Sequence, residues 1–168
     1  MPLFLDRYPF QRWVDQTRTP PVEQWVAVLP VLLSEPGLAA PSPGAAVQHW
    51  LLDTGSRGEA FAWRHHLLVG GLDPDVGRFP RVIDITSAFG GKHPVPSREA
   101  DLWLVSNLAA FQGQPWRLEL MQGVPFYDVQ TLPDSHFNRP LIGMRALRRA
   151  RLRVEVDCAA DAVSVWVP

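Results

Sequence analysis

The chain has 168 residues, of which 46% are apolar and 20% charged, and its formal net charge is −1. This length fits one domain, or one domain with an arm, and the near-zero charge gives no general attraction to nucleic acid or anionic lipid. A single cysteine, Cys158, excludes an internal disulfide framework. No apolar run is long enough to span a membrane and the N-terminus lacks the basic region of a signal peptide, so we expect a cytoplasmic protein without a membrane partner.

Seventeen prolines favour short strands joined by turns over long helices. Residues 1–21 are expected to form an N-terminal arm, and residues 22–168 the domain proper. Within the domain, the β-branched and aromatic residues of 23–33 and 47–53 predict two strands. A segment rich in Pro, Gly, Ala and Ser separates them and predicts a loop.

The second half of the chain continues the β pattern. Alternation in EAFAWRHHL (59–67) predicts a strand, and a long hairpin is expected with arms at 81–89 and 100–107 and a glycine-containing tip. Further strands are predicted in the segments 116–129 (bent at Gly123), 152–157 and 162–167. The only helix predicted lies at about 142–150, after Pro140. The expected fold class is therefore all-β with one short helix.

The stretch WLLDTGS places an ionisable carboxylate, Asp53, directly after three large apolar residues. Asp, Thr and Gly all favour turns, so a plain Asx turn between two strands is one explanation. A carboxylate that acts on water is the other. A second pattern, PLIGMRAL (140–147), has two apolar residues and a glycine entering the predicted helix, as expected if the DTG turn packs beneath that helix.

LLDTGS, the hairpin holding Gly90 and Gly91, and LIGMRAL followed by two terminal strands resemble the retropepsin-like aspartic proteases in order and spacing. The resemblance covers roughly residues 22–167. It implies a half-barrel protomer that needs no cofactor and works as a homodimer, because one chain supplies a single DTG. Asp53 of each protomer would then be catalytic, and the reaction would be hydrolysis of peptide bonds in a peptide or protein substrate.

The resemblance also implies roles for the neighbouring residues. Thr54 would turn its hydroxyl toward the partner's loop, and Gly55 would allow a tight turn and close approach of the substrate. The glycines of the hairpin tip would form a flap over the substrate. The implied supporting and substrate-binding residues are, for the active-site loop, Thr54, Gly55, Ser56, Leu141, Ile142 and Gly143, and for the flap and cleft, Gly90, Gly91 and Arg57.

One departure from the family pattern leaves a second function open. Retroviral members carry an acidic residue shortly after DTG[AS], paired to an Arg that directly follows the helix-entry glycine. Here Arg57 follows Ser56, and Met144 follows Gly143, so that ion pair cannot form in its usual way. Arg57 would either favour acidic substrate side chains or point to solvent or pair with Glu59. The alternative function is a catalytically silent, protease-like module for dimerisation or peptide binding.

Other residue clusters predict no additional site. His65 and His66 are adjacent, so on a strand they would face opposite sides and could not share a metal ion, and no zinc-ligand spacing occurs. The five arginines of RALRRARLR (145–153) are explained best as a solvated helix face, because the whole chain is not basic. We therefore expect no metal and no nucleic-acid partner.

Overall fold

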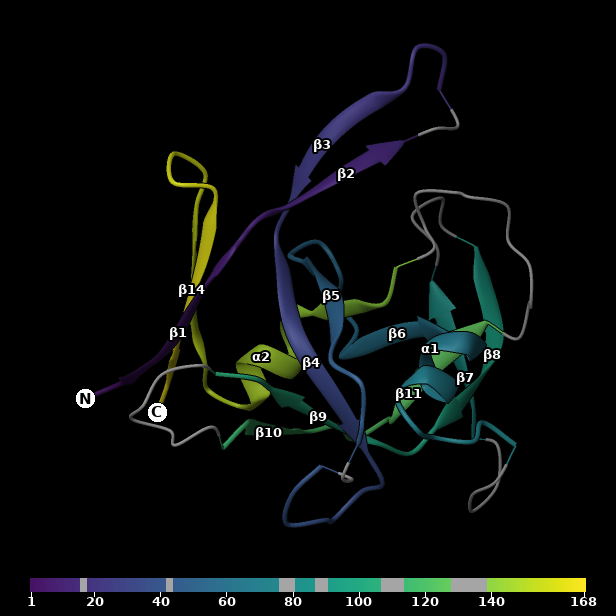
Figure 1. Cartoon of the computed structure of the whole chain (residues 1–168). Coiled ribbons are helices and arrows are strands. Elements are labelled where there is room, and N and C mark those ends of the chain that lie inside the picture. The colour runs from purple at the N-terminus through teal and green to yellow at the C-terminus, as the bar shows by residue number, and fades with distance from the viewer. Residues whose placement is uncertain (16–17, 42–43, 76–80, 87–90, 107–113, 128–138) are drawn as a thin grey trace.

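The computed structural model describes residues 1–15, 18–41, 44–75, 81–86, 91–106, 114–127 and 139–168 (Figure 1). These segments are mostly β, as the sequence predicts, with two short helices, α1 (Arg64–Val69) and α2 (Met144–Arg149). Neither helix has the length or the apolar character needed to cross a membrane. The strands are β1 (Leu3–Pro9), β2 (Gln11–Asp15), β3 (Val22–Val26), β4 (Val28–Ser34), β5 (Gln48–Asp53), β6 (Ala60–Trp63), β7 (Arg81–Thr86), β8 (Lys92–Arg98), β9 (Asp101–Leu104), β10 (Trp116–Glu119), β11 (Val124–Tyr127), β12 (Leu141–Gly143), β13 (Arg153–Asp157) and β14 (Ala162–Val167).

A nine-stranded sheet organises the body, in the order β10-β9-β4-β5-β12-β6-β11-β8-β7. Most neighbours are antiparallel, but β12 runs parallel to β5, and β11 runs parallel to β6. Strands β4 and β9 are buried along almost their whole length. Their nearly continuous apolar runs are typical of strands that are covered on both faces. The two parallel pairs bring together segments far apart in the sequence.

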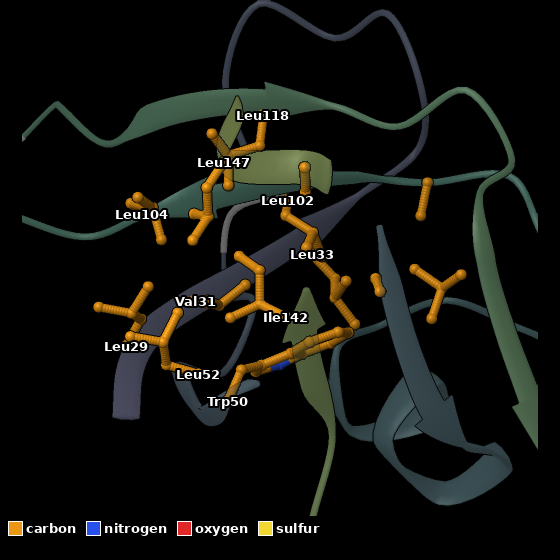
Figure 2. Close-up of a cluster of buried hydrophobic side chains, with 14 of the residues drawn as sticks. Leu29, Val31, Leu33, Trp50, Leu52, Leu102, Leu104, Leu118, Ile142 and Leu147 are labelled. Atoms are coloured by element: carbon orange, nitrogen blue, oxygen red, sulfur yellow. The ribbon is translucent and has the colours of Figure 1, made fainter. Parts of the chain in front are cut away.

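The hydrophobic core lies on one face of the central strands (Figure 2). Trp50 and Leu52 of β5 and Ile142 of β12 pack there with leucines of β4, β9, β10 and α2. Burial of apolar side chains is the main force that holds such elements together, at roughly 25 cal/mol per Å² of surface. The core thus fixes β5 against β12. The labelled members of this cluster are Leu29, Val31, Leu33, Trp50, Leu52, Leu102, Leu104, Leu118, Ile142 and Leu147.

The segment expected to be an arm forms two strands. β1 pairs antiparallel with β14, from Leu3 opposite Val167 to Pro9 opposite Ala162, in a separate sheet of order β1-β14-β13. The Tyr8 hydroxyl also donates a hydrogen bond of 2.7 Å to the carbonyl oxygen of Val105. β2 instead pairs with β3 in a two-stranded ribbon. The first strand of the segment is therefore part of the body, and the second is part of the ribbon.

The predicted hairpin exists with a different second strand. β7 pairs with β8, from Arg81 opposite Ser97 to Thr86 opposite Lys92, so the stretch KHPVPSR is a strand and not a loop. Pro94 and Pro96 are two residues apart, so both missing N–H groups face away from β7. On the other side of β8, strand β11 pairs only with residues 97 and 98 of β8. The predicted second arm, 100–107, contains β9 at Asp101–Leu104, which pairs with β4 and β10 instead.

The predicted strand at 59–67 is correct only in its first half. β6 ends at Trp63, and α1 follows immediately, so His65 and His66 lie on a helix, with their ring centroids 3.8 Å apart. The backbone N–H of Trp63 donates to Nδ1 of His66 at 3.2 Å, which satisfies one of the free donors at the start of the helix.

The predicted bend at Gly123 is confirmed by its φ of 66° between β10 and β11.

Candidate active site

Asp53 is the last residue of β5, and its side chain is half-buried. Its Oδ1 accepts hydrogen bonds from the backbone N–H groups of Gly55, at 3.0 Å, and Ser56, at 3.1 Å. These contacts form an Asx turn, one of the two explanations of the motif that the sequence left open. Among the described residues, no cation forms an ion pair with this carboxylate, and Oδ2 has no hydrogen-bond partner. One carboxylate oxygen therefore holds the turn, and the other remains available.

The two sequence motifs meet side by side. Strand β12 runs parallel to β5, with Leu141 opposite Leu51 and Gly143 opposite Asp53. The Gly143 N–H donates to the carbonyl oxygen of Glu59 at 2.9 Å. A Cβ on Gly143 would lie 2.3 Å from the carbonyl oxygen of Gly58, a distance that no side chain can tolerate. Glycine at 143 is thus required for the loop after Asp53 to pack on the strand that enters α2.

Asp53 shares its face of the sheet with partly exposed apolar residues. Residues directly opposite each other on paired strands point to the same side, so Leu51, Leu141 and Phe61 form a row across β5, β12 and β6. All three are half-buried, like Asp53 two positions beyond Leu51. The opposite face of the same strands is buried in the core. The carboxylate is therefore placed at the end of an apolar surface that is not fully covered.

The rest of the loop differs in exposure. Thr54 is exposed, and among the described residues nothing accepts or donates a hydrogen bond to its hydroxyl. Ser56 is half-buried, and its hydroxyl oxygen accepts the N–H of Gly58 at 3.1 Å. A Cβ on Gly55 would lie 3.4 Å from Asp53 Oδ1, so the chain leaves room for a small side chain there. Packing within the chain thus explains the glycine at 143 but not the one at 55.

Glu59 anchors the end of the loop, a role that no feature of the sequence indicates. The residue is only 2% exposed, and its Oε2 accepts the backbone N–H groups of Met121, at 2.9 Å, and Gln122, at 3.1 Å. Its Oε1 forms an ion pair with Arg149 of α2 at 3.6 Å. This pair connects the segment after the DTG turn to the helix after Gly143.

Arg57 takes no part in that arrangement. Its side chain is exposed, and among the described residues it has no ion-pair partner. Glu59, which the sequence offered as one possible partner, is held by Arg149 and by backbone N–H groups instead. Arg57 thus leaves a positive charge at the exposed edge of the loop that begins at Asp53.

The hairpin expected to act as a flap is described only in part. Gly90 lies outside the described residues, whereas Gly91 is half-buried and directly precedes β8. In the order of the sheet, three strands separate β5 from the hairpin. Because β11 pairs only with the last residues of β8, most of the hairpin extends beyond its neighbouring strand (Figure 1).

The adjacent histidines lie on α1, and the His66 ring contacts Trp63, which belongs to an aromatic cluster with Phe61 and Tyr127. Burial and the neighbouring His65 lower the pKa of His66 to about 3, so its imidazole is neutral at physiological pH. Within the described ranges, no three His, Cys, Asp or Glu side chains are grouped as a metal ion would require.

Comparisons of the chain with models of protein families, with curated proteins and with solved structures found no significant match.

Proposed function

We propose that the protein is an aspartic endopeptidase that hydrolyses peptide bonds as a homodimer, with one Asp53 from each protomer. The observation that carries the proposal is the pairing of Asp53 with Gly143 across β5 and β12, where a Cβ at Gly143 would collide with the loop. This packing holds a half-exposed carboxylate at the end of a strand and beside a row of apolar residues. A simple turn between strands would not need the second motif ninety positions downstream.

The chemistry requires two carboxylates. A peptide bond reacts very slowly with water, so a base must take a proton from the attacking water while an acid protonates the carbonyl oxygen. Two carboxylates held about 3 Å apart do not both ionise and share one proton, as in the aspartic proteases that serve as the general example of this effect. The ionised carboxylate then accepts the proton of water, and the protonated one donates to the oxygen. As the C–N bond breaks, the proton taken from water passes to the leaving nitrogen, and the other carboxylate recovers its proton from a hydroxyl of the intermediate as the C=O bond forms again.

Other residues of this chain would orient the carboxylate, contact the substrate and cover it. Asp53 Oδ1 is held by two backbone N–H groups, so the turn fixes the orientation of the carboxylate and leaves Oδ2 available for water. The row of Leu51, Leu141 and Phe61 offers an apolar surface to substrate side chains. The exposed Thr54 hydroxyl would reach the partner's loop, and the β7–β8 hairpin, with Gly90 and Gly91, would cover an extended peptide.

A second candidate, a protease-like module that binds or dimerises without turnover, is favoured by one observation. The Asp53 carboxylate also serves as the acceptor of an ordinary Asx turn, a role that needs no catalysis. A mixed peptide library, incubated from acidic to neutral pH with the parent and with Asp53→Asn, distinguishes the two. Cleavage by the parent that is lost in the variant supports the protease. Peptide binding or dimerisation with no cleavage by the parent supports the module, and equal cleavage by both would assign the activity elsewhere.

A further inference from the structure

Arg57 lies in the loop that begins at Asp53, on the same face of the sheet as the carboxylate. Gly143 is opposite Asp53 on the paired strand, so a Cβ at Gly143 would point to the Asp53 face. Such a Cβ would lie 2.3 Å from the Gly58 carbonyl oxygen and 3.1 Å from Ser56 Oγ. The loop therefore covers this face at Ser56 and Gly58, and Arg57 is the residue between them.

The positive charge of Arg57 is not neutralised by the part of the chain that the structure describes. Its side chain is exposed and forms no ion pair there. Glu59, two positions away, is 2% exposed, accepts two backbone N–H groups and pairs with Arg149 instead. The Asp53 turn is held by backbone N–H groups and not by a guanidinium. No ion pair within the described segments therefore competes with an outside anion for the Arg57 guanidinium.

The proposed dimer would bring two such loops together. Its two Asp53 carboxylates would share one proton and so carry a single negative charge between them. The two copies of Arg57 would carry two positive charges, whereas each Glu59 is neutralised by its Arg149. The two loops together would have an excess of one positive charge, which attracts an anionic group and disfavours a cationic one.

We propose that Arg57 selects substrates that carry an aspartate or glutamate a few residues from the scissile bond. The inference rests on the proposed function and names the substrate class of the same site. A guanidinium binds a carboxylate through two parallel N–H···O hydrogen bonds, which gives the contact a defined geometry. Alternate side chains of an extended peptide lie about 6.6 Å apart on one side. An apolar side chain can thus contact the apolar row beside Asp53 while an acidic neighbour reaches Arg57.

The test uses peptides of equal length with the same apolar residues at the centre and Glu, Gln or Lys at one flanking position, varied in turn. The parent should show a kcat/KM about fivefold or more higher for the best Glu peptide than for its Lys counterpart at low salt, since exposed charges attract and repel only modestly. This ratio should fall toward one at high salt, which screens exposed charges. Arg57→Glu should reverse the preference, and Arg57→Met should abolish it.

Arg148→Glu is the matched control, because it changes the net charge of the protein as much as Arg57→Glu does. Arg148 is exposed and lies on α2, which packs on the core side of the sheet through Leu147 (Figure 2). The control should keep the preference of the parent. Circular dichroism and urea unfolding show whether each variant folds, and Arg57→Met serves if the charge reversal impairs folding. A ratio near one in the parent, a ratio unchanged in the Arg57 variants, or an equal change in Arg148→Glu would overturn the inference.

Binding of the same peptides distinguishes a failure of this inference from a failure of the proposed protease. Dissociation constants are measured by fluorescence anisotropy with labelled peptides for the parent and for Arg57→Glu. A parent that cleaves no peptide but binds the Glu peptide more tightly, with the order reversed in Arg57→Glu, would contradict the protease and support the role of Arg57. Cleavage without an acidic preference would contradict the inference alone. Neither cleavage nor charge-dependent binding would contradict both.

Discussion

Gly143 lies opposite Asp53 in a parallel strand pair, and its N–H donates to the carbonyl oxygen of Glu59 at 2.9 Å. A residue near the end of the chain thereby fixes both ends of the loop that begins at Asp53. The position of the carboxylate is consequently a property of the tertiary fold as well as of the DTG turn.

Gly143→Ala should destabilise the protein by about 3 kcal/mol, because the added Cβ would overlap the Gly58 carbonyl oxygen and force the backbone apart. Gly55→Ala is the matched variant in the same loop. It should cost less than about 1 kcal/mol, since its Cβ would meet only Asp53 Oδ1 at 3.4 Å. Urea unfolding of the two variants measures the difference. Equal losses would mean that β12 does not pack on the loop as described.

Gly55→Ala should nonetheless impair peptide cleavage. In the proposed enzyme, substrate approaches the backbone at this turn, and a misplacement of about 1 Å can cost about 100-fold in rate. A folded variant with reduced kcat/KM would thus separate the role of Gly55 from that of Gly143. Full activity in Gly55→Ala would contradict the close approach of substrate at this residue.

Glu59→Gln should lower the free energy of unfolding by about 1–3 kcal/mol, because the amide oxygen can still accept the two N–H groups but carries no charge, and the amide NH2 group would face the Arg149 cation. Arg149→Met should cost less, about 1 kcal/mol, since the Arg149 side chain is 40% exposed and its ion pair spans 3.6 Å. Unfolding by urea gives both values. A greater loss for Arg149→Met would show that the ion pair, and not the backbone hydrogen bonds, holds Glu59.

Stability should fall as the pH is lowered from 7 to 5, and His66 should account for part of the loss. Its pKa is lowered to about 3 in the folded protein from an ordinary 6.5, so the unfolded chain binds a proton that the folded protein does not. This contribution is complete above pH 6.5 and decreases as the pH falls toward 3. It amounts to at most about 2 kcal/mol between pH 7 and 5.

His66→Gln supplies the control for that prediction. A glutamine oxygen at this position of the helix can still accept the Trp63 N–H, but it does not titrate. The variant should therefore remain folded and should lose less stability over the same pH range in urea unfolding. An unchanged pH dependence would assign the titration to another group.

Thr54→Val should leave the unfolding of the protomer nearly unchanged, because Thr54 is exposed and has no hydrogen bond within the described part of the chain. It should weaken the dimer if the hydroxyl reaches the partner's loop, by about 1 kcal/mol or somewhat more for each hydrogen bond lost. Thr54→Ser retains the hydroxyl and should dimerise like the parent. Sedimentation over a concentration series measures both variants. Identical constants for Thr54→Val and Thr54→Ser would contradict the proposed contact.

The sequence was sufficient where the local pattern and the tertiary contacts agree. Strands at 47–53, 116–129, 152–157 and 162–167 and the helix after Gly143 follow from alternation, a glycine bend and an apolar helical pattern. The proximity of PLIGMRAL to the DTG turn could be expected from the order of the motifs. Its register, with Gly143 opposite Asp53, required the structure.

The errors have physical causes. Residues 92–98 carry two prolines and read as a loop, but the prolines alternate and so place both missing donors on the side away from β7. The alternation of EAFAWRHHL continues past Trp63, yet the chain there begins a helix whose first turn is held by His66. Glu59 has no sequence signal for its role, because its partners at 121, 122 and 149 are set by the packing of distant segments.

The central claim, that each active site uses one Asp53 from each of two protomers, is tested most directly by mixing subunits. Parent protein and Asp53→Asn are mixed in equal amounts under conditions that allow the subunits to exchange. The cleavage rate of the mixture is then compared with that of parent protein at the same total protein concentration. If both aspartates are required, random pairing leaves about one quarter of the dimers active, and the rate falls to that fraction. A rate of one half would mean that each protomer works with its own groups alone, and would contradict the account.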